Sequence, residues 1–496
     1  MNSWDCFDTL IARKYFHPKT VFDEVGRRIG DPEFKAKRVA AEKASNKTYE
    51  DIYARLPGVD PQIELDVEME HAFPIIENMK QVKDGDFIIS DMYLSAEFVE
   101  KLLRHCGLDK EVKIIVTPDG KKKGWIWNTI NKDAIDTHYG DNYKSDIIGA
   151  QDHGINAVYC TQYQYTDIEL LVSKKDKNLS NWMRYVRLQS PYTGKEHNFW
   201  KDQANVNLPC LALATLELPQ DRNIAFTYRD CHNWHKLYEK MTGKKGYKLD
   251  SSRAMYRHGN SLFDDHVKKL VKKKCVFVDL QGKGHSIWNY FKQEPPETIY
   301  IGGSTLPYIK NLTNYATKSM EKHNAWIYGT VIDYDENGPV RAANDHPEDV
   351  AVIQMEAVSI GIRSYDKFKD FTRNLELLTE LVKYYNYSNT TNKNVTWRGE
   401  IFHGQAYTYN VAALRKSAKQ AANQKLLDAL FERPITLYVQ GTNGEIKIRC
   451  TKLSSLIPKE LRLKKDSPGK NKVFVWDINM ECWRTILYDN VLRWGN

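Results

Sequence analysis

The chain has 496 residues, of which 42% are hydrophobic and 27% charged, a balance typical of a folded protein rather than a disordered one. Its length exceeds what one ordinary core accommodates, so we expect two to four domains. Residues 1–170 carry 22 basic and 30 acidic side chains, so the net charge of +8 arises from residues 171–496. An acidic front suits metal binding and a basic remainder suits a polyanion such as nucleic acid, although solvated lysine faces without a partner would give the same balance.

No apolar run reaches the roughly 20 residues of a membrane span, so we expect no membrane partner. Asp5 and Asp8 lie where a signal peptide would have its apolar segment, and the eight cysteines form no C-x-x-C pair. These features predict a cytoplasmic protein with reduced thiols.

The first predicted element is a short strand that ends at Asp5, followed by an acidic turn containing Asp8 and Thr9. The carboxyl ends of strands in an open α/β sheet face the ligand crevice, so Asp5 is a candidate nucleophile or metal ligand. Taken alone, the same turn is also typical of an ordinary helix N-cap.

Residues 12–85 are predicted to be mainly helical, with helices at 20–29, 32–53 and 60–79. From residue 87 onward, apolar strands alternate with helices. Predicted strands cover 87–90, 112–116 and 157–160, and predicted helices cover 95–106, about 124–132 and 146–153. This alternation predicts an α/β fold with a parallel sheet and crossover helices.

Four motifs in residues 1 to about 165 resemble those of the haloacid dehalogenase-like (HAD) phosphohydrolases. They read WDCFDTLIAR, IISDMYL, KKKG and GDNYKSDIIGAQDHGI, and their wording is similar to that of a subgroup of predicted hydrolases found in bacteria and phages. The resemblance implies a HAD-type Rossmann-like sheet over residues 1–165. It also implies that residues 12–85 form a helical cap, which excludes water and selects substrate.

The resemblance implies catalytic roles for three of the motif residues. Asp5 would attack phosphorus and form an aspartyl-phosphate, and Ser90 would hydrogen-bond the phosphoryl oxygens. Lys121 would stabilise the nucleophile and the phosphate, because a dianionic ester repels a carboxylate until cations neutralise it. Lys122 and Lys123 follow directly, so the choice among the three lysines stays open.

Mg²⁺ is the implied cofactor. Asp5, Asp141 and the backbone carbonyl of Phe7 would hold it, with Asp146 supporting them. In one respect the sequence departs from the family, whose phosphatases place a second Asp, the general acid, two residues after the nucleophile. Here Phe7 occupies that position and Asp8 follows it. Either Asp8 protonates the leaving group, or the reaction lacks help worth roughly 10²–10⁴ in rate.

Residues 171–430 form a second predicted α/β domain, with a polar loop at 384–395 and a helical connector at 411–431. The segment after the strand that ends at Asp279 faintly resembles the phosphoribosyl-binding loop of phosphoribosyltransferases. An ordinary tight turn between a strand and a helix explains the same pattern more simply. The candidate phosphate-binding residues of this domain are Asp279, Gly282, Lys283, Gly284, Ser286, Arg229, Asp230 and Arg253.

Residues 435–496 change to a β pattern. A hairpin is predicted from strands at 435–440 and 445–450 around Asn443-Gly444, with further strands at 473–478 and 482–486. The segment resembles a small SH3-like barrel that recurs in phage proteins, which suggests a phage or bacterial host cytoplasm. Basic and aromatic side chains give a candidate nucleic-acid surface, although core tryptophans beside ordinary surface lysines are an equal alternative. The candidates are Arg449, Lys464, Lys465, Trp483 and Arg484.

Three hypotheses about function follow, and the oligomeric state stays open. The first is a Mg²⁺-dependent phosphohydrolase acting on a nucleotide, a nucleic-acid end or a sugar phosphate. The second is a bifunctional glycosyl- or phosphoribosyl-transferase in nucleic-acid modification, whose HAD head is an accessory phosphatase. The third is a nucleic-acid-binding protein with a degenerate HAD head.

Overall fold

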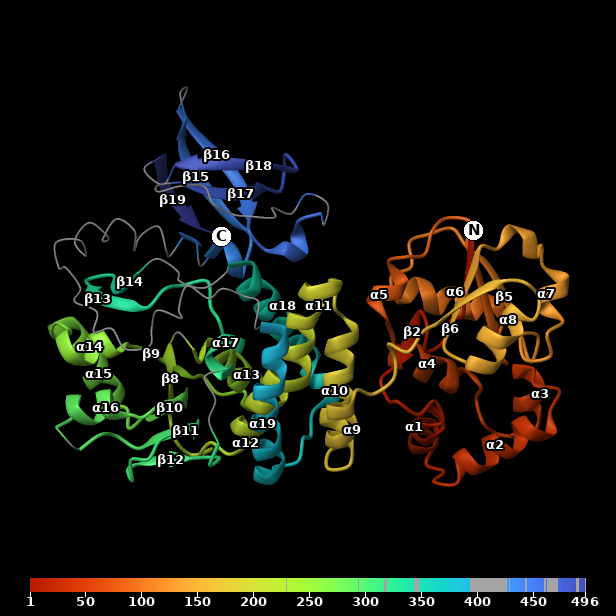
Figure 1. Ribbon diagram of the computed structural model, residues 1–496, viewed down its shortest axis with the longest axis horizontal. Coiled ribbons are helices and arrows are strands. Elements are labelled where there is room, and N and C mark those ends of the chain that lie inside the picture. The colour runs from red at the N-terminus through yellow and green to blue at the C-terminus, as the bar shows by residue number, and fades with distance from the viewer. Residues whose placement is uncertain are drawn as a thin grey trace. The chain divides into compact units, whose positions relative to one another are not determined.

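The structure is a computed structural model of the chain (Figure 1). It describes residues 1–228, 230–292, 294–315, 319–342, 348–392, 426–427, 429–441, 444–458, 461, 472–487 and 490–495. The chain divides into two compact units. The first consists of Met1–Pro209 and Ser359–Thr372, and the second of Cys210–Val358 and Arg373–Asn496.

The first unit contains a five-stranded parallel sheet with strand order β5-β4-β1-β6-β7. The strands are β1 (Asn2–Trp4), β4 (Phe87–Asp91), β5 (Lys113–Thr117), β6 (Thr137–Gly140) and β7 (Asn156–Tyr159). In chain order this is the 3-2-1-4-5 arrangement of doubly wound folds, in which strand order reverses beside the first strand. The predicted α/β class with a parallel sheet is confirmed.

Both faces of this sheet are covered, which explains why its strands read as continuous apolar runs. Ile88 packs with Trp4 and the apolar side of α6 (Ala96–His105) on one face. Phe87 and Ile89 pack on the other face with Trp127 of α7 (Ile126–Thr129). A turn of π-helix (Tyr143–Ile148) and α8 (Gly149–Gln151) connect β6 to β7.

The segment between β1 and β4 is a helical insertion with a short strand at each end. Strands β2 (Ile11–Arg13) and β3 (Ala72–Pro74) pair antiparallel at its two ends. The prediction of one helix over 60–79 is therefore wrong in part, because residues 72–74 pair with β2 and Pro74 cannot continue a helix. The helices are α1 (Thr20–Ile29), α2 (Phe34–Ala44), α3 (Tyr49–Ala54), α4 (Gln62–His71) and α5 (Ile76–Met79).

The insertion has its own small core and a buried ion pair. Val25, Phe34 and Ile52 are fully buried in this core. The Arg38 guanidinium donates to both carboxylate oxygens of Glu64, at 2.7 and 2.9 Å, and both side chains are wholly buried. A bidentate, buried pair fixes the geometry of α2 against α4.

After β7 the first unit continues as helices α9 (Asp167–Ser173), α10 (Lys177–Leu188) and α11 (Gly194–Asp202). Trp182 of α10 donates its indole N–H to the carbonyl oxygen of Gly361 at 3.0 Å. Gly361 lies in α18 (Glu348–Phe368), whose last residues belong to this unit. A segment distant in sequence thus completes the packing around α10.

The second unit contains another five-stranded parallel sheet, with strand order β12-β11-β10-β8-β9. Its strands are β8 (Ile224–Tyr228), β9 (Tyr247–Asp250), β10 (Val276–Gln281), β11 (Thr298–Gly302) and β12 (Ile309–Asn311). Its helices are α12 (Leu208–Leu216), α13 (His232–Thr242), α14 (Arg253–His258), α15 (Ser261–Lys272), α16 (His285–Tyr290), α17 (Ser319–His323) and α19 (Leu375–Asn392). A two-stranded hairpin, β13 (Val331–Asp335) with β14 (Gly338–Arg341), adds to this unit.

The prediction of a loop at 384–395 is wrong as far as residue 392, because α19 extends to Asn392. Tyr385 is fully buried, and its ring meets His323 edge to face at 5.0 Å. Burial of such a side chain overrides the weak helix propensity of the Asn-rich sequence. Residues 393–395 and most of the predicted connector at 411–431 lie outside the described residues.

The C-terminal part of the second unit is an antiparallel sheet of five strands in the order β18-β17-β16-β15-β19. The strands are β15 (Ile435–Gly441), β16 (Gly444–Thr451), β17 (Lys472–Asp477), β18 (Cys482–Leu487) and β19 (Val491–Gly495). The predicted hairpin is confirmed, because β15 pairs with β16 from Ile435–Cys450 to Gly441–Gly444. Asn443 of its turn lies outside the described residues.

In the part of the chain that the structure describes, none of the helices combines the length and the apolar character needed to cross a membrane.

Candidate functional site

The candidate site lies at the carboxyl edge of the first parallel sheet, where the strand order reverses. Asp5 directly follows the central strand β1, and its backbone N–H donates to the carbonyl oxygen of Tyr139 in β6 at 2.8 Å. Asp141 directly follows β6. The two acidic residues therefore flank the crevice in which open α/β sheets bind their ligands.

Three carboxylates meet here. One oxygen each of Asp5, Asp141 and Asp146 lies within 4.8 Å of the others. Asp146 is fully buried, Asp5 is 7% exposed and Asp141 is partly buried. The Lys121 ammonium, 2% exposed, donates to Asp5 Oδ1 at 2.5 Å and to Asp146 Oδ1 at 2.7 Å. Of the three adjacent lysines, Lys121 is thus the one that enters the cluster.

Asp91 fixes the direction of Lys121. Its Oδ1 accepts the backbone N–H of Lys121 and its Oδ2 accepts that of Lys122, each at 2.9 Å. Thr117 donates its hydroxyl to Asp91 at 3.0 Å and accepts the N–H of Gly120 at 2.9 Å. These hydrogen bonds from Asp91 and Thr117 fix the backbone of the loop, so Lys121 points into the site while Lys122 remains exposed.

Asp146 is held from two sides. Its Oδ2 accepts the backbone N–H of Asn142 at 2.9 Å, and its Oδ1 lies 3.4 Å from Nε2 of the buried His138. Burial lowers the pKa of His138, so the neutral ring can donate to Asp146 and accept the Ser3 hydroxyl at Nδ1, 2.8 Å away. A Cβ at Gly140 would lie 2.4 Å from Asp146 side-chain atoms, so this close approach requires glycine.

The electrostatics leave an excess of negative charge. Burial raises the pKa of Asp5 to about 6 although Lys121 opposes the rise, and the charge of Asp146 adds to it. Burial and then the charges of Asp5, Asp8 and Asp146 raise the pKa of Asp141 to about 9. Burial also acts to raise the pKa of Asp146, but Lys121 and His138 outweigh it and hold that pKa below its ordinary value. Asp141 is therefore the carboxyl whose charge is least compensated.

This arrangement fits a metal ion. When ionised, three carboxylates and one ammonium leave two negative charges in a water-poor crevice, which a divalent cation would neutralise. The uncompensated Asp141 is the clearest sign of the fit. Oxygen ligands of this kind suit hard cations.

Ser90 and Phe7, two further predicted site residues, are both buried. Ser90 is 3% exposed near the end of β4, two residues beyond Ile88, the partner of Trp4. The Phe7 ring packs 4.1 Å from the Arg13 guanidinium, which donates to both oxygens of Glu68. The Phe7 side chain therefore has an apolar, packed environment and offers no proton.

Asp8 stands in a left-handed backbone conformation, with φ of 58°. Burial raises the pKa of its carboxyl, while the charges of Arg13 and Arg184 oppose the rise. Arg184 of α10 is fully buried, and its Nη2 lies 3.9 Å from Asp8 Oδ1. Nη2 has no hydrogen-bond partner within the described part of the chain. Arg184, Asp91 and His138 were not among the predicted site residues. Asp91 follows Ser90 in the second motif, which could have indicated it, whereas no local pattern marks Arg184 or His138.

The candidate phosphate-binding residues of the second unit gather at the carboxyl edge of its own parallel sheet. Asp230 follows β8, Arg253 begins α14 after β9, and the Gly282–Gly284 loop and Ser286 follow β10. Burial and then the charge of Asp230 raise the pKa of Asp279 well above its ordinary range. Gly282 and Gly284 have φ of 149° and 81°, which favour glycine. Lys283 is exposed, and Arg229 lies outside the described residues.

The candidate nucleic-acid residues of the C-terminal sheet do not share one face. Trp483 pairs with Trp476 and Arg484 with Val475, so the two side chains point to opposite sides of β18. Arg484 donates to Asp477 at 2.6 Å, and Arg449 donates to Thr436 at 3.2 Å. Lys464 and Lys465 lie outside the described residues. Nucleic-acid binding stays a prediction.

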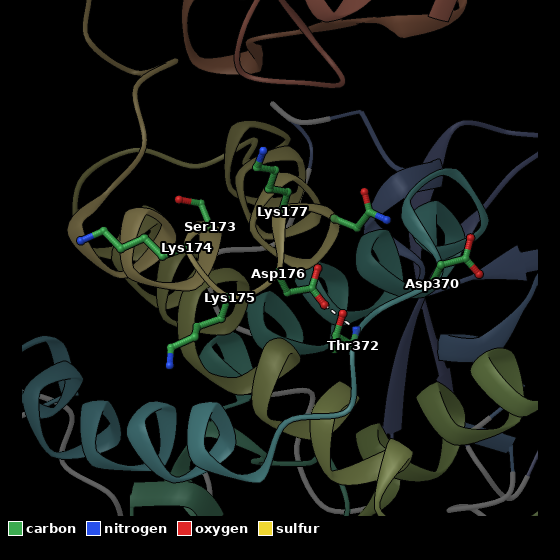
Figure 2. Close-up of a pocket in the computed structure, with 8 residues that line it drawn as sticks. Ser173, Lys174, Lys175, Asp176, Lys177, Asp370 and Thr372 are labelled. Atoms are coloured by element: carbon green, nitrogen blue, oxygen red, sulfur yellow. Dashed lines mark hydrogen bonds between the residues drawn. The ribbon is translucent and has the colours of Figure 1, made fainter. Parts of the chain in front are cut away.

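A shallow hollow of about 350 Å³ lies where α9 meets α10 (Figure 2). Asp176 accepts the backbone N–H of Thr372 at 2.6 Å and that of Leu179 at 2.9 Å, so its carboxylate is engaged in capping. The side chains of Lys174 and Lys177 point in different directions (Figure 2). The residues do not converge on a common ligand position.

No family model matches the chain, and no curated protein matches it.

Proposed function

We propose that the chain is a Mg²⁺-dependent phosphohydrolase of the HAD type, with Asp5 as nucleophile and residues 12–85 as cap. The observation that carries this proposal is the buried Lys121 ammonium between Asp5 and Asp146, beside the uncompensated Asp141. A carboxylate can approach a dianionic phosphate ester only when cations neutralise the charge. The site combines a carboxylate, an ammonium and a metal-binding set in one crevice.

The proposed reaction has two displacement steps. The Asp5 carboxylate bonds to phosphorus as the bond to the leaving oxygen breaks, and water then attacks the aspartyl-phosphate and releases inorganic phosphate. Lys121 neutralises charge on Asp5 and on the phosphoryl group, and Ser90 donates its hydroxyl to a phosphoryl oxygen. Asp5, Asp141 and the Phe7 carbonyl would hold Mg²⁺, which would supply Lewis-acid neutralisation of the phosphoryl charge.

Asp8 is the proposed general acid. Its pKa is raised by burial, so its carboxyl retains a proton to a higher pH than an exposed one. Its charge raises the pKa of Asp141, which supports a position near the metal-binding carboxylates. In the family the general acid usually stands at the position of Phe7. Because Phe7 has no proton to donate, we assign this role to Asp8.

Phosphate release tests the proposal. The substrates are p-nitrophenyl phosphate, mononucleotides, sugar phosphates and end-phosphorylated oligonucleotides, each with and without Mg²⁺. We expect Mg²⁺-dependent release that Asp5→Asn abolishes and that Asp152→Asn, a change at an exposed carboxylate of the same unit, leaves intact. A folded protein that releases phosphate from none of these substrates refutes the proposal.

The second parallel sheet favours one further candidate function. In chain order its strands run 2-1-3-4-5, and such sheets bind ligands outside the strands where the order reverses, here β8 and β10. Asp230 and the Gly282–Gly284 loop follow these two strands, and Asp279 lies within β10, two residues before its end and not at the end as predicted. A glycosyl- or phosphoribosyl-transferase site would bind a sugar nucleotide or a sugar diphosphate there. Binding that is unaffected by both Asp279→Asn and Lys283→Ala would exclude it.

A further inference from the structure

A pocket of about 610 Å³ lies next to the acidic cluster, within the first unit. Its floor comes from the loops after β4, β5 and β6, which end at the same edge of the sheet as β1. Its opposite wall comes from Glu42 and Lys47 of the helical insertion. Asp91 and Ser145 line it, and these residues hold or adjoin Lys121 and Asp146. The pocket adjoins the cluster through these two residues, while Asp5, Lys121, Asp141 and Asp146 themselves do not line it.

The acidic side chains that line this pocket already have partners. Glu42 accepts from the Arg38 guanidinium at 3.1 Å. Asp119 accepts from the Lys47 ammonium with both oxygens, at 2.9 and 2.8 Å, and Lys123 lies 3.3 Å away. The oxygens of Asp91 accept the two backbone N–H groups already described. All three carboxylates are therefore engaged in hydrogen bonds, and the charges of Glu42 and Asp119 are also balanced by neighbouring cations.

Two lysines that line the same pocket, in contrast, have no carboxylate partner among the described residues. Lys122 and Lys144 line it and are exposed, and neither ammonium lies within 4.0 Å of a carboxylate among the described residues. Lys122 follows β5 and Lys144 follows β6, so the two lysines belong to different loops at the same edge of the sheet. Two uncompensated ammonium groups in a hollow attract an anion. The volume is within the range of small-molecule sites and exceeds the need of phosphate alone.

We propose that the substrate is a phosphate monoester whose leaving group carries a second anionic group, a carboxylate or a phosphate, bound by Lys122 and Lys144. The inference rests on the proposed phosphohydrolase function and deepens it by naming the substrate class. The Lys47–Asp119 pair joins the insertion to the loop that carries Lys121, so the wall of the pocket and the catalytic lysine are held together.

A matched pair of substrates tests this proposal. 4-Carboxyphenyl phosphate and 4-carbamoylphenyl phosphate have nearly the same size and differ in charge. We expect kcat/KM to favour the carboxylate by about 10-fold at low salt, equivalent to about 1.4 kcal/mol and within reach of two exposed ion pairs. The preference should arise mainly in KM and should fall as salt is added.

The variants compare the pocket lysines with an exposed lysine elsewhere in the same unit. In the double variant Lys122→Met/Lys144→Met the ratio of the two kcat/KM values should fall about 10-fold relative to the unmodified protein. Comparing ratios cancels the different reactivities of the two leaving groups. Lys101→Met, which removes an exposed lysine of α6 that does not line the pocket, should keep the ratio. An unchanged ratio in the double variant overturns the proposal.

Equilibrium binding separates this proposal from the proposed function. Isothermal titration calorimetry of both esters with the Asp5→Asn protein should show tighter binding of the carboxylate, lost when Lys122 and Lys144 are also replaced. If the esters bind in this way but neither is hydrolysed by the unmodified protein, the anion site stands and the phosphohydrolase proposal fails. If both are hydrolysed with no lysine-dependent preference, the phosphohydrolase stands and the anion site fails.

Discussion

Asp141→Asn should stabilise the metal-free protein and remove its response to Mg²⁺. In the folded chain the pKa of Asp141 is raised from 3.8 to about 9 by burial and by the charges of Asp5, Asp8 and Asp146. Between these two values the folded state binds more protons than the unfolded state. The free energy of unfolding contributed by this group therefore falls as pH rises from about 4 to about 9.

The size of the effect follows from the same change. The difference between 3.8 and about 9 would correspond to about 7 kcal/mol for a fully buried, isolated carboxyl. Asp141 is only partly buried, so solvent screening reduces the gain to about 2 kcal/mol at pH 8. For a unit of this size that gain raises the Tm by about 4–8 °C.

Thermal unfolding in EDTA and in excess Mg²⁺, at pH 5 and pH 8, measures the prediction. The unmodified protein should gain about 2.7 kcal/mol when Mg²⁺ is at 100 times its Kd, whereas Asp141→Asn should gain almost nothing. The advantage of Asp141→Asn in EDTA should shrink at pH 5, where the folded protein already holds the proton. Asp152→Asn is the control for loss of a charge. A lower Tm for Asp141→Asn in EDTA, or a full response to Mg²⁺, would refute the reasoning.

Lys121→Met should abolish phosphate release and lower the free energy of unfolding by about 3 kcal/mol, because Asp146 loses its buried cation; an unchanged urea midpoint would contradict this. Gly140→Ala should lower the free energy of unfolding, measured by urea denaturation, by about 2 kcal/mol, because the added Cβ would overlap the Asp146 side chain. An unchanged free energy of unfolding would show that the close approach is dispensable. Arg184→Gln should raise the pKa of Asp8 and move the alkaline limb of kcat/KM to higher pH. If the alkaline limb of the kcat/KM profile stays at the same pH, Asp8 is not the general acid that Arg184 influences.

The sequence by itself determined the parts of the fold that depend on local chemistry. Buried parallel strands need continuous apolar runs, so the strand at 87–90 was predictable, and Asp5 at a strand end was a natural candidate. The helix at 95–106 was equally clear, because the Ser95 hydroxyl accepts the N–H of Phe98 and caps an amphipathic segment. These signals lie within a few residues of the elements they specify.

Only the tertiary structure decided the features that depend on distant partners. Residues 72–74 form a strand instead of a helix because they pair with β2, some sixty residues earlier in the chain. Lys121, Lys122 and Lys123 are chemically identical, and the Asp91 carboxylate orients their loop by accepting the backbone N–H groups of Lys121 and Lys122. In that loop only the Lys121 side chain reaches Asp5 and Asp146. Arg184 reaches Asp8 only because α10 packs beside the hairpin, where its guanidinium donates to the Arg13 carbonyl. Pairing between segments far apart in the chain leaves no local mark in a single sequence, so the folded chain alone brings these groups together.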